Sequence, residues 1–186
     1  MHQLLMSRVL LLAITACFVT ACTNNKKTED ATAPSPLPTT ISNWTAGIVH
    51  DSTRIPPATF AIVQDVRTAR HDDHDRIVFE FSGSDIPGFH IEYVDEPVRE
   101  CGSGKAVYLP GDGWLMIKFL SARMHKNGNS TVSQRDLEPN HPNLLRLTTV
   151  CDFENYVTWI ASVASPNKFQ VLTLKNPPRL VVDIKN

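Results

Sequence analysis

The segment RIVFEF, residues 76–81, decides the fold class of this 186-residue chain. Its apolar residues Ile77, Phe79 and Phe81 alternate with Val78 and Glu80. A period of two is typical of a β-strand that buries one face and turns the other toward solvent. The sequence therefore predicts β-structure here, and the same reasoning extends along the chain.

Nine segments after residue 58 share this pattern, and breaks rich in Gly, Pro and Asn separate them. No segment between Ala58 and Asn186 has a convincing helical period and length, so crossover helices for a parallel sheet are missing. We therefore expect an all-β fold, an antiparallel β-sandwich. The expected strands are Thr59–Arg67, Arg76–Phe81, Gly88–Val94, Lys105–Leu109, Trp114–Leu120, Leu144–Cys151, Tyr156–Val163, Phe169–Leu174 and Leu180–Ile184.

The composition fits one ordinary folded domain, with 42% hydrophobic and 20% charged residues. The 18 Lys and Arg residues nearly balance the 19 Asp and Glu residues, and no stretch is strongly basic. Neutralising several phosphates needs such a stretch, so the composition argues against a nucleic-acid-binding protein. A collagen period, a heptad run and repeated membrane-length segments are also missing, which excludes fibrous proteins and polytopic membrane proteins.

Residues 1–21 have the layout of a secretory signal, with a basic start, the apolar run Val9–Ile14 and small residues before a cysteine. Two tetrapeptides resemble the bacterial lipobox, and they end at Cys17 and Cys22. Cys22 is preferred because the polar stretch Thr23–Lys27 follows it at once. We predict cleavage before Cys22 and its modification with fatty acids such as palmitate. A plain signal peptide or a single anchor helix is the alternative.

Residues 22–57 contain few large apolar groups, and Pro34, Pro36 and Pro38 favour an extended conformation. This composition predicts a flexible tether between the lipid and the folded domain, residues 58–186. The protein would then be exported and held in the cell envelope by its lipid, at an outer membrane or at the cell surface.

Export would place Cys101 and Cys151 in an oxidising compartment. We predict that they form a disulfide, which would close a loop of about 50 residues. Two separate buried thiols are the alternative, since sequence spacing says nothing about the distance between them.

Several strand-length motifs are shared with a known family. They are Val66-Arg67, Asp75–Gly83, Pro87–Val94, Gly102–Gly104, Asp152–Glu154, Thr158-Trp159 and Pro177–Ile184. With them, the segment from Thr59 to Lys185 resembles the AMIN and AMIN-like domains of bacterial envelope proteins, and the middle motifs resemble the AMIN-like branch. The resemblance implies a non-catalytic β-sandwich, which in the AMIN branch directs cell-wall amidases and secretion pores to envelope sites by binding peptidoglycan.

The residues themselves give little sign of catalysis. His71–Asp75 is the densest cluster of potential metal ligands, but its place between two strands is typical of an Asp-rich turn. Ser103 lies in Gly102–Gly104, which lacks the outer residues of a nucleophile elbow. We therefore expect no enzyme, no metal ion and no cofactor.

Aromatic and charged residues on outward faces are the candidate ligand contacts, because glycans stack on rings and bond to polar groups. Trp159 shares a face with apolar neighbours and is expected in the core. Trp114 should point away from the Leu115–Phe119 face, with core packing an equal alternative. For Arg76 and Arg179 the alternative is pairing with a carboxylate. The candidates are Trp114, Tyr156, Arg67, Arg76 and Arg179.

Peptidoglycan is the expected ligand, and two other functions stay open. One is a protein-interaction module, which would dock an envelope enzyme or pore at a sheet edge or at the long polar segment Met124–Asn143, expected to be a surface loop. The other is a carrier of a small apolar ligand, which needs a cavity above roughly 300 Å³. A charged and aromatic face would favour the wall, and an apolar patch would favour a protein partner.

Overall fold

The computed structural model describes residues 38–52 and 59–186. These residues form strands and no helix, so none is available to span a bilayer. The strands are β1 (Thr39–Thr40), β2 (Val49–Asp51), β3 (Ala61–Arg70), β4 (His74–Phe81), β5 (Gly88–Val94), β6 (Gly113–Leu120), β7 (Ala122–Arg123), β8 (His125–Lys126), β9 (Asn129–Ser130), β10 (Asp136–Leu137), β11 (Leu144–Phe153), β12 (Tyr156–Val163), β13 (Phe169–Leu174) and β14 (Arg179–Lys185).

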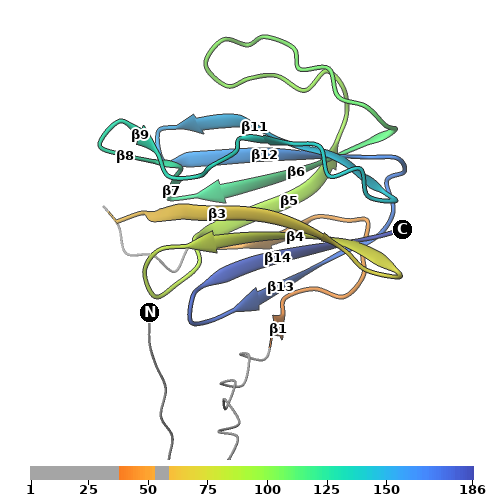
Figure 1. Ribbon diagram of the computed structural model, residues 1–186, viewed down its shortest axis with the longest axis horizontal. Coiled ribbons are helices and arrows are strands. Elements are labelled where there is room, and N and C mark those ends of the chain that lie inside the picture. The colour runs from red at the N-terminus through yellow and green to blue at the C-terminus, as the bar shows by residue number, and fades with distance from the viewer. Residues whose placement is uncertain (1–37, 53–58) are drawn as a thin grey trace, which may run out of the picture. The chain divides into compact units, whose positions relative to one another are not determined.

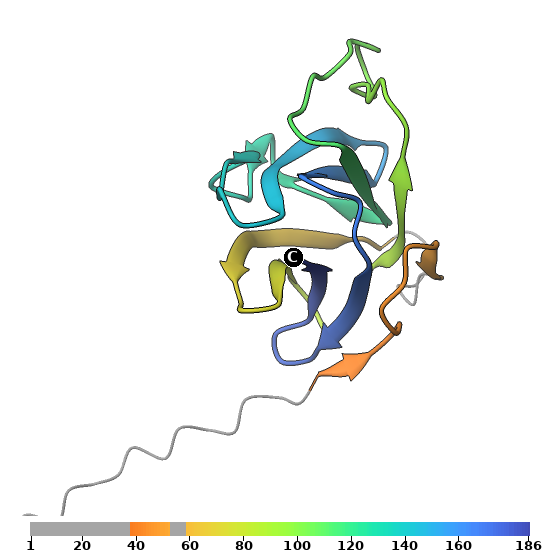
Figure 2. The same cartoon turned by 90° about the vertical axis from the view of Figure 1, so that its right-hand side faces the viewer.

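Two six-stranded sheets form the sandwich (Figure 1). Sheet A has the order β1-β13-β14-β4-β3-β7, and sheet B has the order β10-β11-β12-β6-β5-β2. Adjacent strands in both sheets are antiparallel, apart from β3 and β7, which pair in parallel. Figure 2 shows the strands nearly end-on, with the segment before β6 outside sheet B, on the side away from sheet A. The all-β class and the sandwich predicted from the sequence are confirmed.

The core lies between the two inner faces, where the alternating apolar residues of both sheets meet. Phe79 of β4 contacts Phe119 of β6, with ring centroids 5.0 Å apart, and Trp159 of β12, at 5.8 Å. All three side chains are fully buried, so the prediction that Trp159 packs in the core is confirmed.

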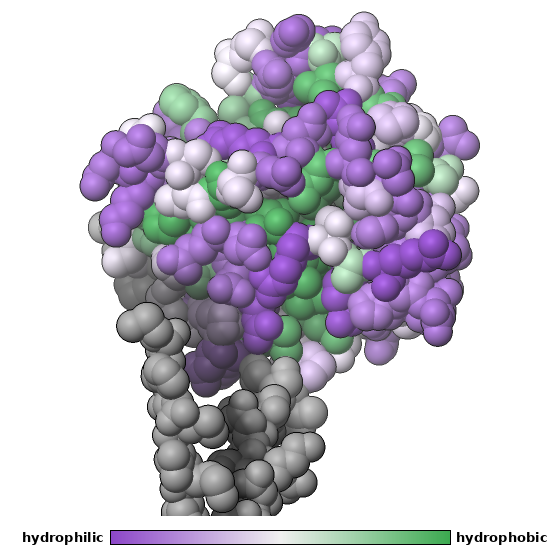
Figure 3. Space-filling model, in the orientation of Figure 1, coloured by the Kyte–Doolittle hydropathy of each residue, from purple (hydrophilic) through white to green (hydrophobic). Residues whose placement is uncertain are grey.

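Figure 3 shows one outer face of the molecule. Hydrophobic residues are visible near its middle, and hydrophilic residues surround them.

The expected strand bounds are correct for β5, β12 and β13 and nearly so for five others, but the expected strand Lys105–Leu109 is wrong. Its Val107 N–H donates to the carbonyl of Val98 at 2.8 Å, and Ala106 forms an isolated bridge with Arg99. The segment therefore pairs with residues 98–100 and not with a strand of either sheet.

The described part of the expected tether, residues 38–52, belongs to the sandwich. In β1, Thr39 pairs with Thr173, while β2 adds an edge strand beside β5. Val49 is buried, and Ile41 packs against the core. The folded part thus begins well before residue 58, because β1 and β2 pair at the sheet edges and two apolar side chains near them join the core. The leader, Cys17, Cys22 and the remaining tether residues lie outside the described residues.

Candidate binding groove

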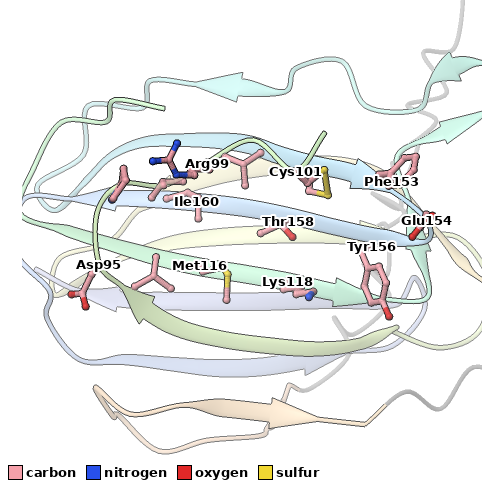
Figure 4. Close-up of a pocket in the computed structure, with 15 residues that line it drawn as sticks. Asp95, Arg99, Cys101, Met116, Lys118, Phe153, Glu154, Tyr156, Thr158 and Ile160 are labelled. Carbon is pink, nitrogen blue, oxygen red and sulfur yellow. A yellow bond between two sulfur atoms is a disulfide. The ribbon is translucent and has the colours of Figure 1, made fainter. Parts of the chain in front are cut away.

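A groove of about 460 Å³ lies on the outer face of sheet B, between the sheet and the segment that joins β5 to β6. Figure 4 shows how its lining changes along the strands. Met116 and Ile160 form an apolar stretch, and Lys118 and Thr158 follow. Phe153 and Tyr156 come last and form what we call the aromatic end. The groove thus combines an apolar floor with polar and aromatic groups.

The joining segment, residues 95–112, forms one wall of the groove. It is folded on itself, since the Glu100 N–H donates to the carbonyl of Lys105 at 2.9 Å. Its Val98 and Leu109 pack against Val150 and Ile160 of sheet B. We call this segment the wall segment.

The predicted disulfide between Cys101 and Cys151 is present, and it links the wall segment to β11. The two Cα atoms are 5.2 Å apart. Beside it, the Cys101 N–H donates to the carbonyl of Val150 at 3.0 Å. The covalent bond and the small apolar cluster together hold the wall over the sheet.

The aromatic end is built on the hairpin between β11 and β12. Glu154 and Asn155 both have positive φ, 50° and 64°, as in the two-residue turn that fits the twist of a hairpin. Phe153 and Tyr156 flank this turn as a directly opposed pair, and they are 61% and 44% exposed. The Asn155 side chain accepts a 2.6 Å hydrogen bond from Arg123, which fixes the turn from β7.

Charged groups in the groove lining balance in number. Lys118 and Arg99 are cationic, and Asp95 and Glu154 are acidic. The Lys118 ammonium lies 4.8 Å from the centroid of the Tyr156 ring, a cation–π contact. Arg99 donates to the carbonyl of Gly104 at 2.9 Å, within the wall segment.

The five residues proposed from the sequence as ligand contacts do not come together. Tyr156 lines the groove, whereas Trp114 packs partly buried beside the Val98 and Leu109 cluster. Trp114 does point away from the core face, as its place in the strand predicted, but the wall segment covers it. The other three candidates are arginines on the outer face of sheet A.

Those arginines have partners of their own. Arg76 donates twice to Asp183, at 2.6 and 2.8 Å, and this bonding raises the pKa of the guanidinium. Arg67 pairs with Asp65 and lies 3.4 Å from Glu80. The Arg179 side chain donates to a backbone carbonyl at 3.4 Å. The pairing that was an alternative for Arg76 is therefore what the structure contains.

The cluster His71–Asp75 comprises the turn between β3 and β4 and the first two residues of β4. The His71 and His74 rings stack with centroids 4.4 Å apart, while the Asp75 carboxylate turns inward and accepts two backbone N–H groups, at 2.7 and 2.8 Å. Hydrogen bonds from Lys185 and His74 lower the pKa of Asp73 to about 2. Within the described residues, no three His, Cys, Asp or Glu side chains are placed to hold a metal ion.

The segment Met124–Asn143, expected as a surface loop, contains β8, β9 and β10 and is anchored to β11 by Asp152. The Asp152 carboxylate accepts from the Met124 N–H at 3.1 Å and from Arg135 at 2.7 Å. His125 Nδ1 lies 3.0 Å from the same carboxylate. The side chain of Met124 is fully buried, so this segment is more fixed than its polar composition suggested.

This anchor predicts a loss of stability in acid. Burial raises the pKa of Asp152, but hydrogen bonds from His125, Met124 and Arg135 outweigh it and hold the pKa below 3.8. A carboxylate with a lowered pKa stabilises the fold above its unfolded pKa and loses that contribution as the pH falls through its folded pKa. Once the pH is lower than about 4, we expect the melting temperature to decrease. The decrease should be less steep in Asp152→Asn. Thermal melts from neutral to acidic pH measure this, and equal slopes for both proteins would contradict it.

Apart from Tyr156, the groove residues were not proposed from the sequence as ligand contacts, and Phe153 and Lys118 are two examples. Only two residues separate Phe153, at the end of one alternating run, from Tyr156, at the start of the next, which is the signature of a tight hairpin. Lys118 occupies an outward position in the strand Trp114–Leu120. Both signals indicate an exposed face, but neither reveals that the wall segment lies beside it.

Comparison with known families shows which family the chain belongs to. The family model described as the AMIN-like domain matches residues 61–186, from the start of β3 to the end of the chain. The chain belongs to the AMIN-like family. No curated protein and no solved structure matches it.

AMIN-like domains are associated with the bacterial cell envelope, and they are generally non-catalytic binding modules. The match includes both walls of the groove but leaves out β1 and β2, which the structure adds to the sheet edges. The lining residues of the groove in this chain therefore all lie within the matched range.

Proposed function

We propose that this protein is a non-catalytic, lipid-anchored envelope protein whose AMIN-like domain binds cell-wall material, and most directly peptidoglycan. The exposed pair Phe153 and Tyr156 at the end of an open groove is the observation that carries the proposal. Sugar rings present C–H faces that pack on aromatic rings, and a rigid hairpin presents these rings with little loss of conformational entropy.

The proposed location follows from the N-terminal sequence and the disulfide. Lipid attached to Cys22 would hold the protein at a membrane, with the residues up to β1 as the spacer. Cys101–Cys151 fits an exported protein, because disulfides persist in oxidising compartments. An outer membrane and a cell surface are both compatible with this arrangement.

The shape of the groove favours a polymer over an enclosed small ligand. Its volume, about 460 Å³, exceeds the roughly 300 Å³ expected of a small-ligand site. It lies, however, on the outer face of sheet B and not between the sheets. A groove along the strands can accept a segment of a longer chain, whose ends continue into solvent.

Co-sedimentation with purified peptidoglycan tests the proposal. The full-length chain, kept in mild detergent, is expected to pellet saturably, and Tyr156→Ala should bind about five- to tenfold more weakly, the loss of one stacking contact. Tyr108→Ala is the matched control, because Tyr108 is 86% exposed on the wall segment and does not line the groove.

The control variant should bind like the unaltered protein. If the unaltered protein stays in the supernatant at low and at moderate salt, the wall is not the ligand, and a protein partner becomes the leading alternative. Equal binding by the two tyrosine variants would mean that the groove is not the site.

A further inference from the structure

Lys118 stands out among the charged groups of the groove. Its strand neighbours across sheet B are His90 on β5 and Thr158 on β12. Glu92, the nearest acidic residue on β5, is engaged with His90, whose Nε2 lies 3.0 Å from Glu92 Oε1. No ion pair among the described residues includes Lys118, so its charge is directed at the Tyr156 ring and the open groove.

We propose that Lys118 and Tyr156 form a subsite for a saccharide that carries one isolated carboxylate, with the sugar ring on Tyr156 and the carboxylate on the Lys118 ammonium. This assignment rests on the proposed function and names the chemical group that the groove selects. Figure 4 shows both side chains toward the same end of the groove.

The charge balance of the groove favours a single negative charge over a polyanion. Asp95 and Glu154 line the same groove and would repel the repeated phosphates of an anionic polymer. Of the two cations in the described lining, Arg99 uses one guanidinium nitrogen on the Gly104 carbonyl of the wall segment. Lys118 is the cation beside the Tyr156 ring, and an ammonium is a point charge that suits a single carboxylate.

The apolar floor of the groove can contact the part of such a ligand that lies next to its carboxylate. Met116 and Ile160 lie farther along the groove from Lys118, away from the aromatic end. They can contact the methyl groups of acetylated or lactylated sugars, because these groups bury apolar surface without needing a hydrogen bond. The wall segment shields this stretch, which strengthens an ion pair beside it relative to one in open water.

Peptidoglycan with free carboxylates, the same material with its carboxylates converted to amides, and chitin, which has no carboxylates, provide the test. In co-sedimentation we expect Lys118→Gln to bind free-carboxylate peptidoglycan about fivefold more weakly, as for a modest ion pair. Lys118→Arg should restore most of that loss. Lys126→Gln, which removes an exposed lysine of β8 outside the groove, should have no effect.

Amidated peptidoglycan and chitin are expected to bind the unaltered protein and Lys118→Gln equally. An equal loss on free and amidated material would overturn the subsite, because Lys118 would then act through packing alone. No loss on free-carboxylate material, with Tyr156→Ala still impaired, would overturn the subsite and leave wall binding intact. If the unaltered protein binds none of the three materials, the proposed function itself fails.

Discussion

Replacing both Cys101 and Cys151 by serine is expected to lower the free energy of unfolding by about 4 kcal/mol. The bond joins positions 50 residues apart, so its loss frees a long loop in the unfolded chain. In the folded chain it also releases the wall segment, which then depends on the small cluster around Val98 and Leu109. Denaturant unfolding followed by circular dichroism measures the change.

A reducing agent serves as the control for the disulfide prediction. It should destabilise the unaltered protein by a similar amount and leave the double-serine variant unchanged. Binding to peptidoglycan should weaken in parallel, because one wall of the groove is no longer fixed. A double variant within about 1 kcal/mol of the unaltered protein would show that the wall segment is held by packing and hydrogen bonds alone.

Asp183→Ala is expected to cost about 3 kcal/mol, because it leaves Arg76 without its partner on sheet A. The Asp183 side chain is fully buried, and it accepts two hydrogen bonds from Arg76 and one from Gln170, the latter at 3.1 Å. His74 Nε2 also lies 3.6 Å from its carboxylate. Removing the Asp183 carboxylate leaves the donors of Arg76 and Gln170 without their acceptor at a buried position.

Asp136→Ala is the matched variant for this comparison. Asp136 also pairs with one arginine, Arg146, through both carboxylate oxygens, but its side chain is 46% exposed. An exposed pair contributes less than about 1 kcal/mol. Chemical denaturation of both variants should therefore separate them clearly, and equal losses would contradict the role assigned to burial.

The sandwich could be predicted because apolar residues alternate along several strands. In β6 the inward residues Leu115, Ile117 and Phe119 are buried and their neighbours are only partly buried, so the period of two identifies both the strand and its inner face. The match to the AMIN-like family over residues 61–186 agrees with the motifs in the same region. The pairing of Cys101 with Cys151 followed from the exported compartment and not from any spacing.

The groove could not be predicted, because it depends on where a non-strand segment lies. Val107 and Leu109 alternate as in a strand, yet they fold back on Val98 and cover sheet B. Trp114 illustrates the consequence. The sequence predicted that its side chain points away from the core, but not that the wall segment covers it. β1 and β2 were missed for a related reason, because two or three residues give no period to recognise.

The central claim is that the groove beside the wall segment binds cell-wall material. Amide hydrogen exchange of the full-length chain, with and without soluble peptidoglycan fragments at saturating concentration, tests it most directly. The account predicts added protection in residues 95–112 and in the hairpin from Phe153 to Tyr156, with little change elsewhere. Protection confined to the outer face of sheet A around Arg67 and Arg179, or to Met124–Asn143, would contradict it.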